Sequence, residues 1–500
     1  MHDAPVASTT SARGVTAHSS IPFHDSLSPP LSTDELDFSA MSSADVSSRR
    51  PHVLVIAFPS QGHLLPLLDF AHLLSTRHRV HITVAATPSS LPLLSAFLAS
   101  TPLAAALPMP LPDPSAPEQA GQLAPGTHHA LLAVPLSTLR GPLVSWARSQ
   151  RDPPTAVLSD FFLGSAQLIA DDLRVPRVVF YSSGAFATAV AEPLWSGSLP
   201  LDPNSPVVLG DLPGSPSIPY RHVPTMVKAY VPGDPDWELA REGFRLNSRA
   251  WGAVLNTFAA MEGDFLEHLK RHFGHGRVWA VGPVSASGCR ARERPTAGTE
   301  ELFSWLADCP ARSVLYVCFG SMYKPPPAQA AALGAALEAS GVRFIWAVSA
   351  DVAVLPEGLE ERARDRGRVV RGWAPQMEIL RHAAVGAFVT HCGWNSTLEG
   401  VAAGVTLVTW PMKADQFIDA RLVVDVHGAA VRAAEGESAV PDPTTLARVF
   451  ADAVDGAELA GVRAKAVALA VAAAEAVEEG GSSWLDLERM VRELEAVAAA

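Results

Sequence analysis

Cysteine is scarce in this chain of 500 residues, which has only Cys289, Cys309, Cys318 and Cys392. No two of them form a CxxC pair, and their spacing fits no metal site. This excludes a disulfide scaffold and indicates free thiols in a reducing compartment. It agrees with a cytoplasmic location, which the sequence predicts because no secretory signal is visible at the N-terminus.

Long apolar runs and positive charge are also in short supply. No apolar run approaches the roughly 18–20 residues needed to span a bilayer. Lys and Arg number 38 against 51 Asp and Glu, which gives a net charge of −13. This balance argues against nucleic acids and anionic membrane surfaces as partners, although it does not forbid a local site for an anionic ligand. We expect a monomer without a membrane span.

The pattern along the chain predicts an α/β protein with two domains. Residues 1–50 are rich in Ser, Thr, Ala, Pro and Asp without periodicity, which predicts a disordered extension; translation from Met41 is an alternative start. From residue 51, strand patterns alternate with helical ones, and this indicates doubly wound parallel sheets. The predicted strands are 52–58, 81–86, 156–160, 177–182, then 313–320, 343–348, 367–373, 385–391 and 405–410. The predicted division is a first domain over residues 51–284, a polar linker over 285–300, a second domain over 301–480 and a C-terminal helix over 481–500.

The most informative segment is residues 373–416. Here the strand pattern VGAFVTH is followed by the turn HCGW and by NSTLEGVAA, which predicts a helix that opens with a capping residue. The turn would aim backbone N–H groups and the positive end of a helix dipole at an anion. A stacking face, a histidine ring that can carry charge, and groups that read hydroxyls accompany it: Trp373, Gln376, His391, Trp394, Asn395, Ser396, Glu399, Asp415 and Gln416.

Residues 373–416 resemble, over their full length, the C-terminal signature box of plant UDP-dependent glycosyltransferases of secondary metabolism. The resemblance implies the GT-B fold: two facing Rossmann-like domains with a cleft between them, the UDP-sugar in the second and the acceptor in the first, and a last helix that packs back on the first. It implies contacts with uracil, base and ribose from Trp373, Ala374, Gln376 and Glu399. It also implies contacts with the diphosphate from Ser321, His391, Asn395 and Ser396, and with the sugar hydroxyls from Trp394, Asp415 and Gln416. Gln416 favours glucose over galactose, and Trp410 is assigned to the core.

Two residues of the first half are candidate catalytic groups. His63, in PSQGHLLP, is predicted in the loop after the first strand, where it could act as a general base. A lone histidine is more often structural. The family that this chain resembles, however, has its catalytic base in a PxxGHxxP motif, which PSQGHLLP matches. Asp160, at the end of the strand 156–160, would orient the imidazole; the alternative is a helix cap. Phe161, Phe162 and Phe186 are predicted to line an apolar acceptor pocket.

The resulting prediction is an inverting transferase of the flavonol-glucosylating type, which moves glucose from UDP-glucose to a hydroxyl of a small phenolic acceptor. No metal cofactor is expected, because no GxGxxG, Walker A motif or metal-spaced cluster appears. Asp234-Pro-Asp236 has the DxD form of metal–nucleotide sites in another glycosyltransferase architecture, but its Pro/Gly-rich context predicts a turn. A UDP-sugar epimerase of the same fold and a sugar-nucleotide binder without catalysis are the alternatives.

Overall fold

The computed structural model describes residues 51–109, 127–199, 201–287, 297–321, 323–349 and 355–499. Residues 47–500 form one compact unit. The predicted disordered extension with Met41, and positions 288–296 of the predicted linker, lie outside the described residues. Within the described ranges, no helix combines the length and the apolar character that a membrane crossing requires.

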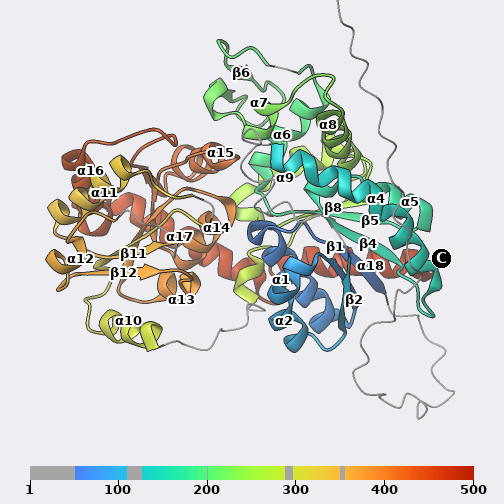
Figure 1. The fold of residues 1–500 in the computed structure, drawn as a ribbon, viewed down its shortest axis with the longest axis horizontal. Coiled ribbons are helices and arrows are strands. Elements are labelled where there is room, and N and C mark those ends of the chain that lie inside the picture. Colours follow the sequence, from blue (N-terminus) through green and yellow to red (C-terminus); the bar gives the residue numbers. More distant parts are fainter. Residues whose placement is uncertain are drawn as a thin grey trace, which may run out of the picture. The chain divides into compact units, whose positions relative to one another are not determined.

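The first half contains a sheet of seven strands, all parallel (Figure 1). Their order is β3-β2-β1-β4-β5-β8-β9. The strands are β1 (His52–Ile56), β2 (His81–Ala86), β3 (Ala104–Pro108), β4 (Ala156–Asp160), β5 (Arg177–Tyr181), β8 (Gly252–Leu255) and β9 (Val278–Ala280). A small antiparallel pair, β6 (Val207–Val208) and β7 (Ser217–Ile218), stands apart from this sheet.

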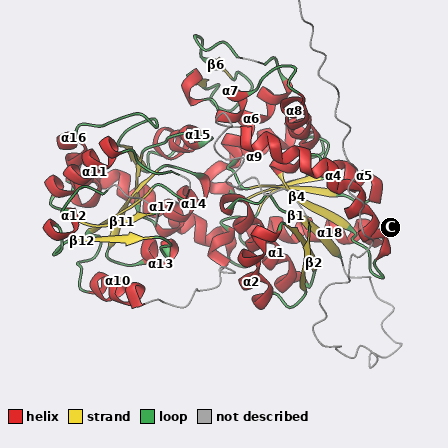
Figure 2. Ribbon diagram, in the orientation of Figure 1, coloured by secondary structure: helices red, strands yellow, loops and turns green. Residues whose placement is uncertain are grey.

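Helices cover both faces of this sheet (Figure 2). They are α1 (Gln61–His78), α2 (Leu91–Ser100), α4 (Thr127–Ser149), α5 (Ala166–Leu173), α6 (Ala185–Ser196), α7 (Thr225–Ala229), α8 (Pro235–Asn247) and α9 (Ala259–Phe273). Because side chains alternate along a strand, Val53 and Val55 pack toward α1 and α2, whereas Leu54 and Ile56 pack toward α4 and α5. Burial on both faces explains why β1 reads as a continuous apolar run.

The second half contains a sheet of six parallel strands in the order β12-β11-β10-β13-β14-β15. These are β10 (Val314–Cys318), β11 (Arg343–Val348), β12 (Gly367–Arg371), β13 (Val385–Thr390), β14 (Thr406–Thr409) and β15 (Ala430–Arg432). Its helices are α10 (Ala297–Ala307), α11 (Pro327–Ser340), α12 (Leu359–Arg362), α13 (Gln376–Arg381), α14 (Trp394–Ala403), α15 (Gln416–Arg421), α16 (Pro443–Asp455) and α17 (Ala460–Val477). Helices α11 and α16 pack on one face, and α14 and α17 on the other.

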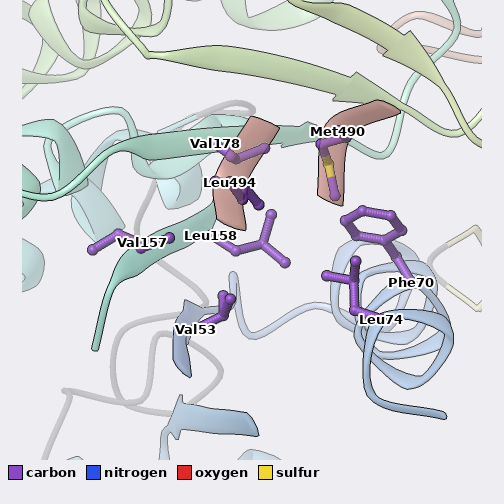
Figure 3. A pocket seen from close by; sticks show the side chains of 9 residues that line it. Val53, Phe70, Leu74, Val157, Leu158, Val178, Met490 and Leu494 are labelled. Atoms are coloured by element: carbon purple, nitrogen blue, oxygen red, sulfur yellow. The ribbon is translucent and has the colours of Figure 1, made fainter. Parts of the chain in front are cut away.

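The last helix, α18 (Ser482–Ala499), contributes Leu487, Met490, Val491 and Leu494 to the core beneath the first sheet. Figure 3 shows Met490 and Leu494 beside side chains of α1, β1, β4 and β5 around a small apolar cavity. Its volume is about 10 Å³, roughly that of a single water-sized sphere. It is therefore a packing void and has no room for a substrate.

The predicted α/β class with two doubly wound parallel sheets is confirmed. Strands 81–86, 156–160 and 343–348 have the predicted bounds, and most others end one or two residues sooner. Short or half-exposed strands were not predicted: β3, β8, β9 and β15. Strands β8, β9 and β15 have only three or four residues, and β3 is rich in alanine. Such segments contain too few large apolar residues for a strand pattern to be recognised.

Candidate active site

Predicted site residues gather where the strand order reverses in each sheet. In the first sheet this point lies between β1 and β4, and His63 follows β1 while Asp160 ends β4. In the second it lies between β10 and β13, and Ser321 follows β10 while His391 follows β13. Open parallel sheets bind ligands beyond their strand carboxyl ends at such switch points. The topology therefore supplies one candidate site per half.

His63 does not lie in a loop, as the sequence predicted, but in the first turn of helix α1. The helix begins at Gln61 with Ser60 as its N-cap, and the backbone N–H of His63 donates to the oxygen of Ser60 (3.0 Å). The helix thus starts one turn earlier than the apolar pattern indicates. This fixes the backbone of His63 more firmly than a loop would.

The His63 Nδ1 and the Asp160 Oδ2 lie 2.9 Å apart, and Asp160 is fully buried. The second carboxylate oxygen, Oδ1, accepts the backbone N–H of Phe162 at 2.8 Å and caps the short 3₁₀ turn Phe161–Leu163. Asp160 therefore contacts the imidazole through Oδ2 and caps the turn through Oδ1, so the two alternatives drawn from the sequence do not exclude each other. With Nδ1 held by Asp160, Nε2 is the ring nitrogen left to accept a proton.

Aromatic rings surround the imidazole of His63. The ring centroid of Phe58 lies 4.9 Å away, that of Phe161 5.5 Å and that of Phe162 4.5 Å. Phe161 and Phe162 thus form an apolar wall beside the imidazole, and their contact with an acceptor stays a prediction. Phe186 differs, because its ring is 4% exposed and stacks on Phe265 at 4.4 Å, so it serves the core.

The turn after β13 departs from the predicted capping. Helix α14 begins at Trp394, and its N-cap is Gly393, which has no side chain to cap the first-turn N–H groups. These N–H groups can therefore bind an anion. Asn395 is not the cap; its Nδ2 donates to the backbone oxygen of Gly62 at 2.7 Å, and so joins this turn to the residue before His63.

The ring of His391 is enclosed next to the anion turn. A Cβ at Gly320 would meet this ring at 2.8 Å and one at Gly393 at 2.6 Å, so both glycines are needed for the ring to fit. Burial, and then the charge of Lys413, lower the pKa of His391 to about 4. The ring is therefore neutral near pH 7 before a ligand binds, and a neutral imidazole can still donate a hydrogen bond to a diphosphate. Ser321, after Gly320, is exposed.

The two other tryptophans of the box, Trp394 and Trp410, are buried. Trp410 is 1% exposed and packs in the core, as predicted. Trp394 is 3% exposed, and its indole N–H donates to the backbone oxygen of Asn256 at 2.8 Å. This side chain joins the two halves, so a contact with sugar would fall to its backbone N–H. Trp373, by contrast, is 60% exposed and offers a ring face.

Three predicted donor residues meet in one hydrogen-bonded group. The Nε2 of Gln376 donates to Glu399 Oε2 at 2.7 Å and to Ser396 Oγ at 3.2 Å. The hydroxyl of Tyr316 donates to the Oε1 of Gln376 at 3.3 Å. Ala374 lies beside Gln376 and packs against the core. The group connects β10, α13 and α14 and holds the amide of Gln376 between Tyr316 and Glu399.

Asp415 and Gln416 are held in different ways. The Ser183 hydroxyl donates to Asp415 Oδ2 at 2.8 Å, and burial raises the pKa of this carboxyl while the Ser183 bond opposes the rise. The Oε1 of Gln416 accepts the backbone N–H groups of Met412 and Lys413, both at 2.9 Å. Only the Nε2 end of this amide is left to contact a sugar hydroxyl.

Ser182 and Ser183 are site residues that the sequence reasoning missed. The Ser182 Oγ lies 3.1 Å from His63 Nδ1, and Ser183 bonds Asp415. Their position directly after β5, next to β4, was the signal that could have identified them. Asp234 of the DxD sequence caps helix α8, since its Oδ1 accepts the N–H groups of Asp236 and Trp237.

Known proteins resemble this chain throughout. The family model described as UDP-glucoronosyl and UDP-glucosyl transferase matches residues 286–453. The flavonol 3-O-glucosyltransferase UGT89B1 of Arabidopsis thaliana is 44% identical over 461 residues, which cover 89% of this chain and 96% of that protein. The flavonol 7-O-rhamnosyltransferase of the same plant is 34% identical over 473 residues, which cover 90% and 99%.

A solved structure agrees with these similarities. The crystal structure of Arabidopsis thaliana UGT89C1 complexed with UDP-L-rhamnose has a TM-score of 0.73 and 35% identity to this chain, and covers 90% of this chain and 100% of that one. Together with the two parallel sheets, this similarity confirms the predicted GT-B fold. The relatives named here are transferases, and they give the epimerase alternative no support.

Proposed function

The chain belongs to the plant UDP-dependent glycosyltransferase family, and we propose that it transfers glucose from UDP-glucose to a phenolic hydroxyl of a flavonoid, with inversion at the anomeric carbon. The observation that carries this proposal is the 2.9 Å contact between His63 Nδ1 and Asp160 Oδ2 among the rings of Phe58, Phe161 and Phe162. A base enclosed by aromatic rings suits a flat phenolic acceptor.

In this mechanism the Nε2 of His63 removes the proton of the acceptor hydroxyl. The acceptor oxygen bonds to the anomeric carbon as the bond from that carbon to the diphosphate oxygen breaks, and the electron pair leaves with UDP. Asp160 stabilises the imidazolium that forms. A phenol with a pKa of about 10 loses its proton readily when the transfer accompanies bond formation. Holding both substrates in place supplies much of the rate increase.

UDP is assigned to the second half. Trp373 would stack on uracil, with Ala374 and Gln376 at the base and ribose and Glu399 at the ribose hydroxyls. The N–H groups of the first turn of α14, with His391, Asn395, Ser396 and Ser321, would hold the diphosphate. Asp415, the Nε2 of Gln416 and the backbone of Trp394 would contact the sugar.

We propose that no metal ion is needed, because the helix terminus can stabilise the charge of the leaving group. Activity that survives an excess of EDTA is the expected result. A strict requirement for a divalent ion would contradict the proposal and would direct attention to Asp234 and Asp236.

Rhamnose transfer is the second candidate, because one relative is named a rhamnosyltransferase and the similar crystal structure contains UDP-L-rhamnose. We favour glucose because Gln416 is present and because UGT89B1, the 44% identical relative, is named a glucosyltransferase. A binder without catalysis is disfavoured by the intact pair of His63 and Asp160.

The test is transfer by the purified full chain from UDP-glucose and from UDP-rhamnose to a panel of flavonols, phenolic acids and hormones. The mass of each product distinguishes a hexose from a deoxyhexose. We expect a hexose on a flavonol. Products only from UDP-rhamnose would replace the donor assignment, and binding of UDP-glucose without any product would favour the inactive binder. A tagged full chain found outside the cytoplasm would contradict the predicted location.

A further inference from the structure

The turn formed by residues 412–417 contains Asp415 and Gln416 and has an unusual backbone. Ala414 has φ of 56°, in the left-handed region that non-glycine residues seldom occupy. Such a conformation is unfavourable for a residue with a side chain and persists only where neighbouring groups hold it. Within the turn, the Oε1 of Gln416 accepts two backbone N–H groups.

The remaining restraints come from residues 217–225 of the first half. The hydroxyl of Thr225, at the start of α7, accepts the backbone N–H of Ala414 at 2.9 Å. The ring of His222 lies parallel to that of Phe417, with a centroid distance of 4.6 Å and an angle of 11°. A guanidinium nitrogen of Arg421, in helix α15, donates to the backbone oxygen of Ser217 at 3.1 Å. These contacts join residues 217–225 to the 412–417 turn and to helix α15.

His222 is itself fixed in place. Only 6% of it is exposed, and its Nε2 lies 3.1 Å from Glu435 Oε2, beyond strand β15. Arg221 approaches the same carboxylate at 3.7 Å. Residues 217–225 therefore contact the 412–417 turn at Ala414 and Phe417, and they are also held by Glu435. Phe417, on which His222 stacks, directly follows Gln416.

We propose that residues 217–225 are a positioning segment for the donor sugar, in which Thr225 and His222 hold the 412–417 turn so that Asp415 and Gln416 meet the sugar hydroxyls. This inference rests on the proposed function, because it assigns those two side chains to the sugar. The hydrogen bonds and the ring contact described above join the segment to the 412–417 turn, to Arg421 and to Glu435. We therefore expect its effect to fall mainly on the sugar, with a smaller effect on UDP through Lys413 of the turn, whose charge acts on His391.

The experiment measures binding by the full chain of UDP and of UDP-glucose, without an acceptor, and then the kcat/KM ratio of UDP-glucose to UDP-galactose. Thr225→Val removes the hydroxyl that accepts the N–H of Ala414 with little change in side-chain shape, whereas Thr225→Ser keeps this hydroxyl. His222→Ala removes the stack, and His222→Phe retains it. Thr76→Val is the matched control, because that exposed hydroxyl only donates to the backbone oxygen of His72 in α1.

We expect Thr225→Val and His222→Ala to weaken UDP-glucose binding and to lower the kcat/KM ratio by about three- to tenfold, the effect of losing one hydrogen bond or contact. UDP affinity should stay within about twofold. Thr225→Ser and Thr76→Val should resemble the wild type, and His222→Phe, which keeps the stack but loses the bond to Glu435, should lie between the wild type and His222→Ala.

Two results would overturn the inference alone: unchanged UDP-glucose binding in both variants, or an equal loss for UDP and UDP-glucose, which would show a general structural role. A wild-type protein that binds neither UDP nor UDP-glucose, or that forms no glycosylated product, would overturn the proposed function and this inference with it. A misfolded variant would be recognised by its circular dichroism spectrum and urea unfolding, and the folded member of the pair Thr225→Val and His222→Ala then decides.

Discussion

The side-chain amide of Asn395 donates a hydrogen bond to the backbone oxygen of Gly62 at 2.7 Å. Asn395 lies in the first turn of α14, and Gly62 precedes His63 in α1. The proposed diphosphate site and the proposed base are therefore joined through one contact that does not involve the imidazole. Changes to the imidazole alone should leave this connection intact, which separates catalysis from donor binding.

His63→Ala should reduce kcat for a flavonol by at least about 10²- to 10⁴-fold, the usual contribution of a general base. The dissociation constant of UDP should change little, because the bond from Asn395 reaches the backbone. Turnover by mass spectrometry and UDP binding by calorimetry test both parts. His72→Ala, later in the same helix, is the control and should remain active. Retained turnover in His63→Ala would remove its role.

Asp160→Asn should lower turnover by about 10²- to 10⁴-fold with little loss of stability. The new amide can cap Phe162 with its oxygen, but its NH₂ group then faces His63 Nδ1 and donates to it. The ring proton is thereby moved to Nε2, which can no longer accept one from the substrate. Asp160→Ala should add a loss of about 1 kcal/mol in unfolding free energy, because the cap is gone. If Asp160→Asn is fully active, Asp160 has no role in catalysis and only caps the turn Phe161–Leu163.

Glu192 provides a prediction for pH. It is buried beside Tyr181, whose hydroxyl donates to its Oε1 at 2.6 Å, and burial raises its pKa from 4.5 to about 7. A raised pKa in the folded state means that the unfolded state releases the proton first, so stability is lost as pH rises from about 4.5 through 7. Glu192→Gln removes this titration. The free energy of unfolding of this variant, measured with urea, should rise relative to that of the wild type across that interval, by at most about 3 kcal/mol. A difference that stays constant with pH would contradict the prediction.

The C-terminal helix offers a matched pair of leucines. Leu494→Ala enlarges the cavity shown in Figure 3 and should destabilise the protein by about 2–5 kcal/mol. Leu485, in the same helix, is 50% exposed, and Leu485→Ala should stay within about 0.5 kcal/mol. Urea unfolding distinguishes them. Equal, small effects would mean that α18 contributes little to the core of the first sheet.

The sequence predicted the sheets because their buried strands are long, β-branched apolar runs such as β1 and β13. It also placed His63 and Asp160 at the carboxyl ends of neighbouring strands, where the structure has them, and their functional roles stay predictions. These features are local, and so one chain segment is enough to recognise them.

Other features could not be predicted, because partners distant in the chain determine them. The indole of Trp394 is directed by the backbone of Asn256, and the ring of Phe186 by Phe265. The neutral state of His391 follows from enclosure between Gly320 and Gly393. Ser183 could not be connected with Asp415 without the contact between the two halves.

Gln416 has two roles that substitutions can separate: its Nε2 is proposed to contact the sugar, and its Oε1 holds the 412–417 turn. Gln416→His should lower the use of UDP-glucose and raise the relative use of UDP-galactose, since losing one bond to a buried hydroxyl costs about 1–3 kcal/mol, or roughly ten- to a hundredfold. An imidazole cannot reproduce an oxygen that accepts from both Met412 and Lys413, so this variant also loosens the turn.

Gln416→Glu is the control, because one carboxylate oxygen keeps both backbone bonds while the other replaces the Nε2 donor. We expect it to lose UDP-glucose turnover while its unfolding free energy stays close to that of the wild type, whereas Gln416→His loses both. Kinetics with each UDP-sugar and urea unfolding of the same preparations provide the comparison. If Gln416→Glu keeps the wild-type sugar preference, the Nε2 group does not contact the sugar, and Gln416 acts only by holding the turn.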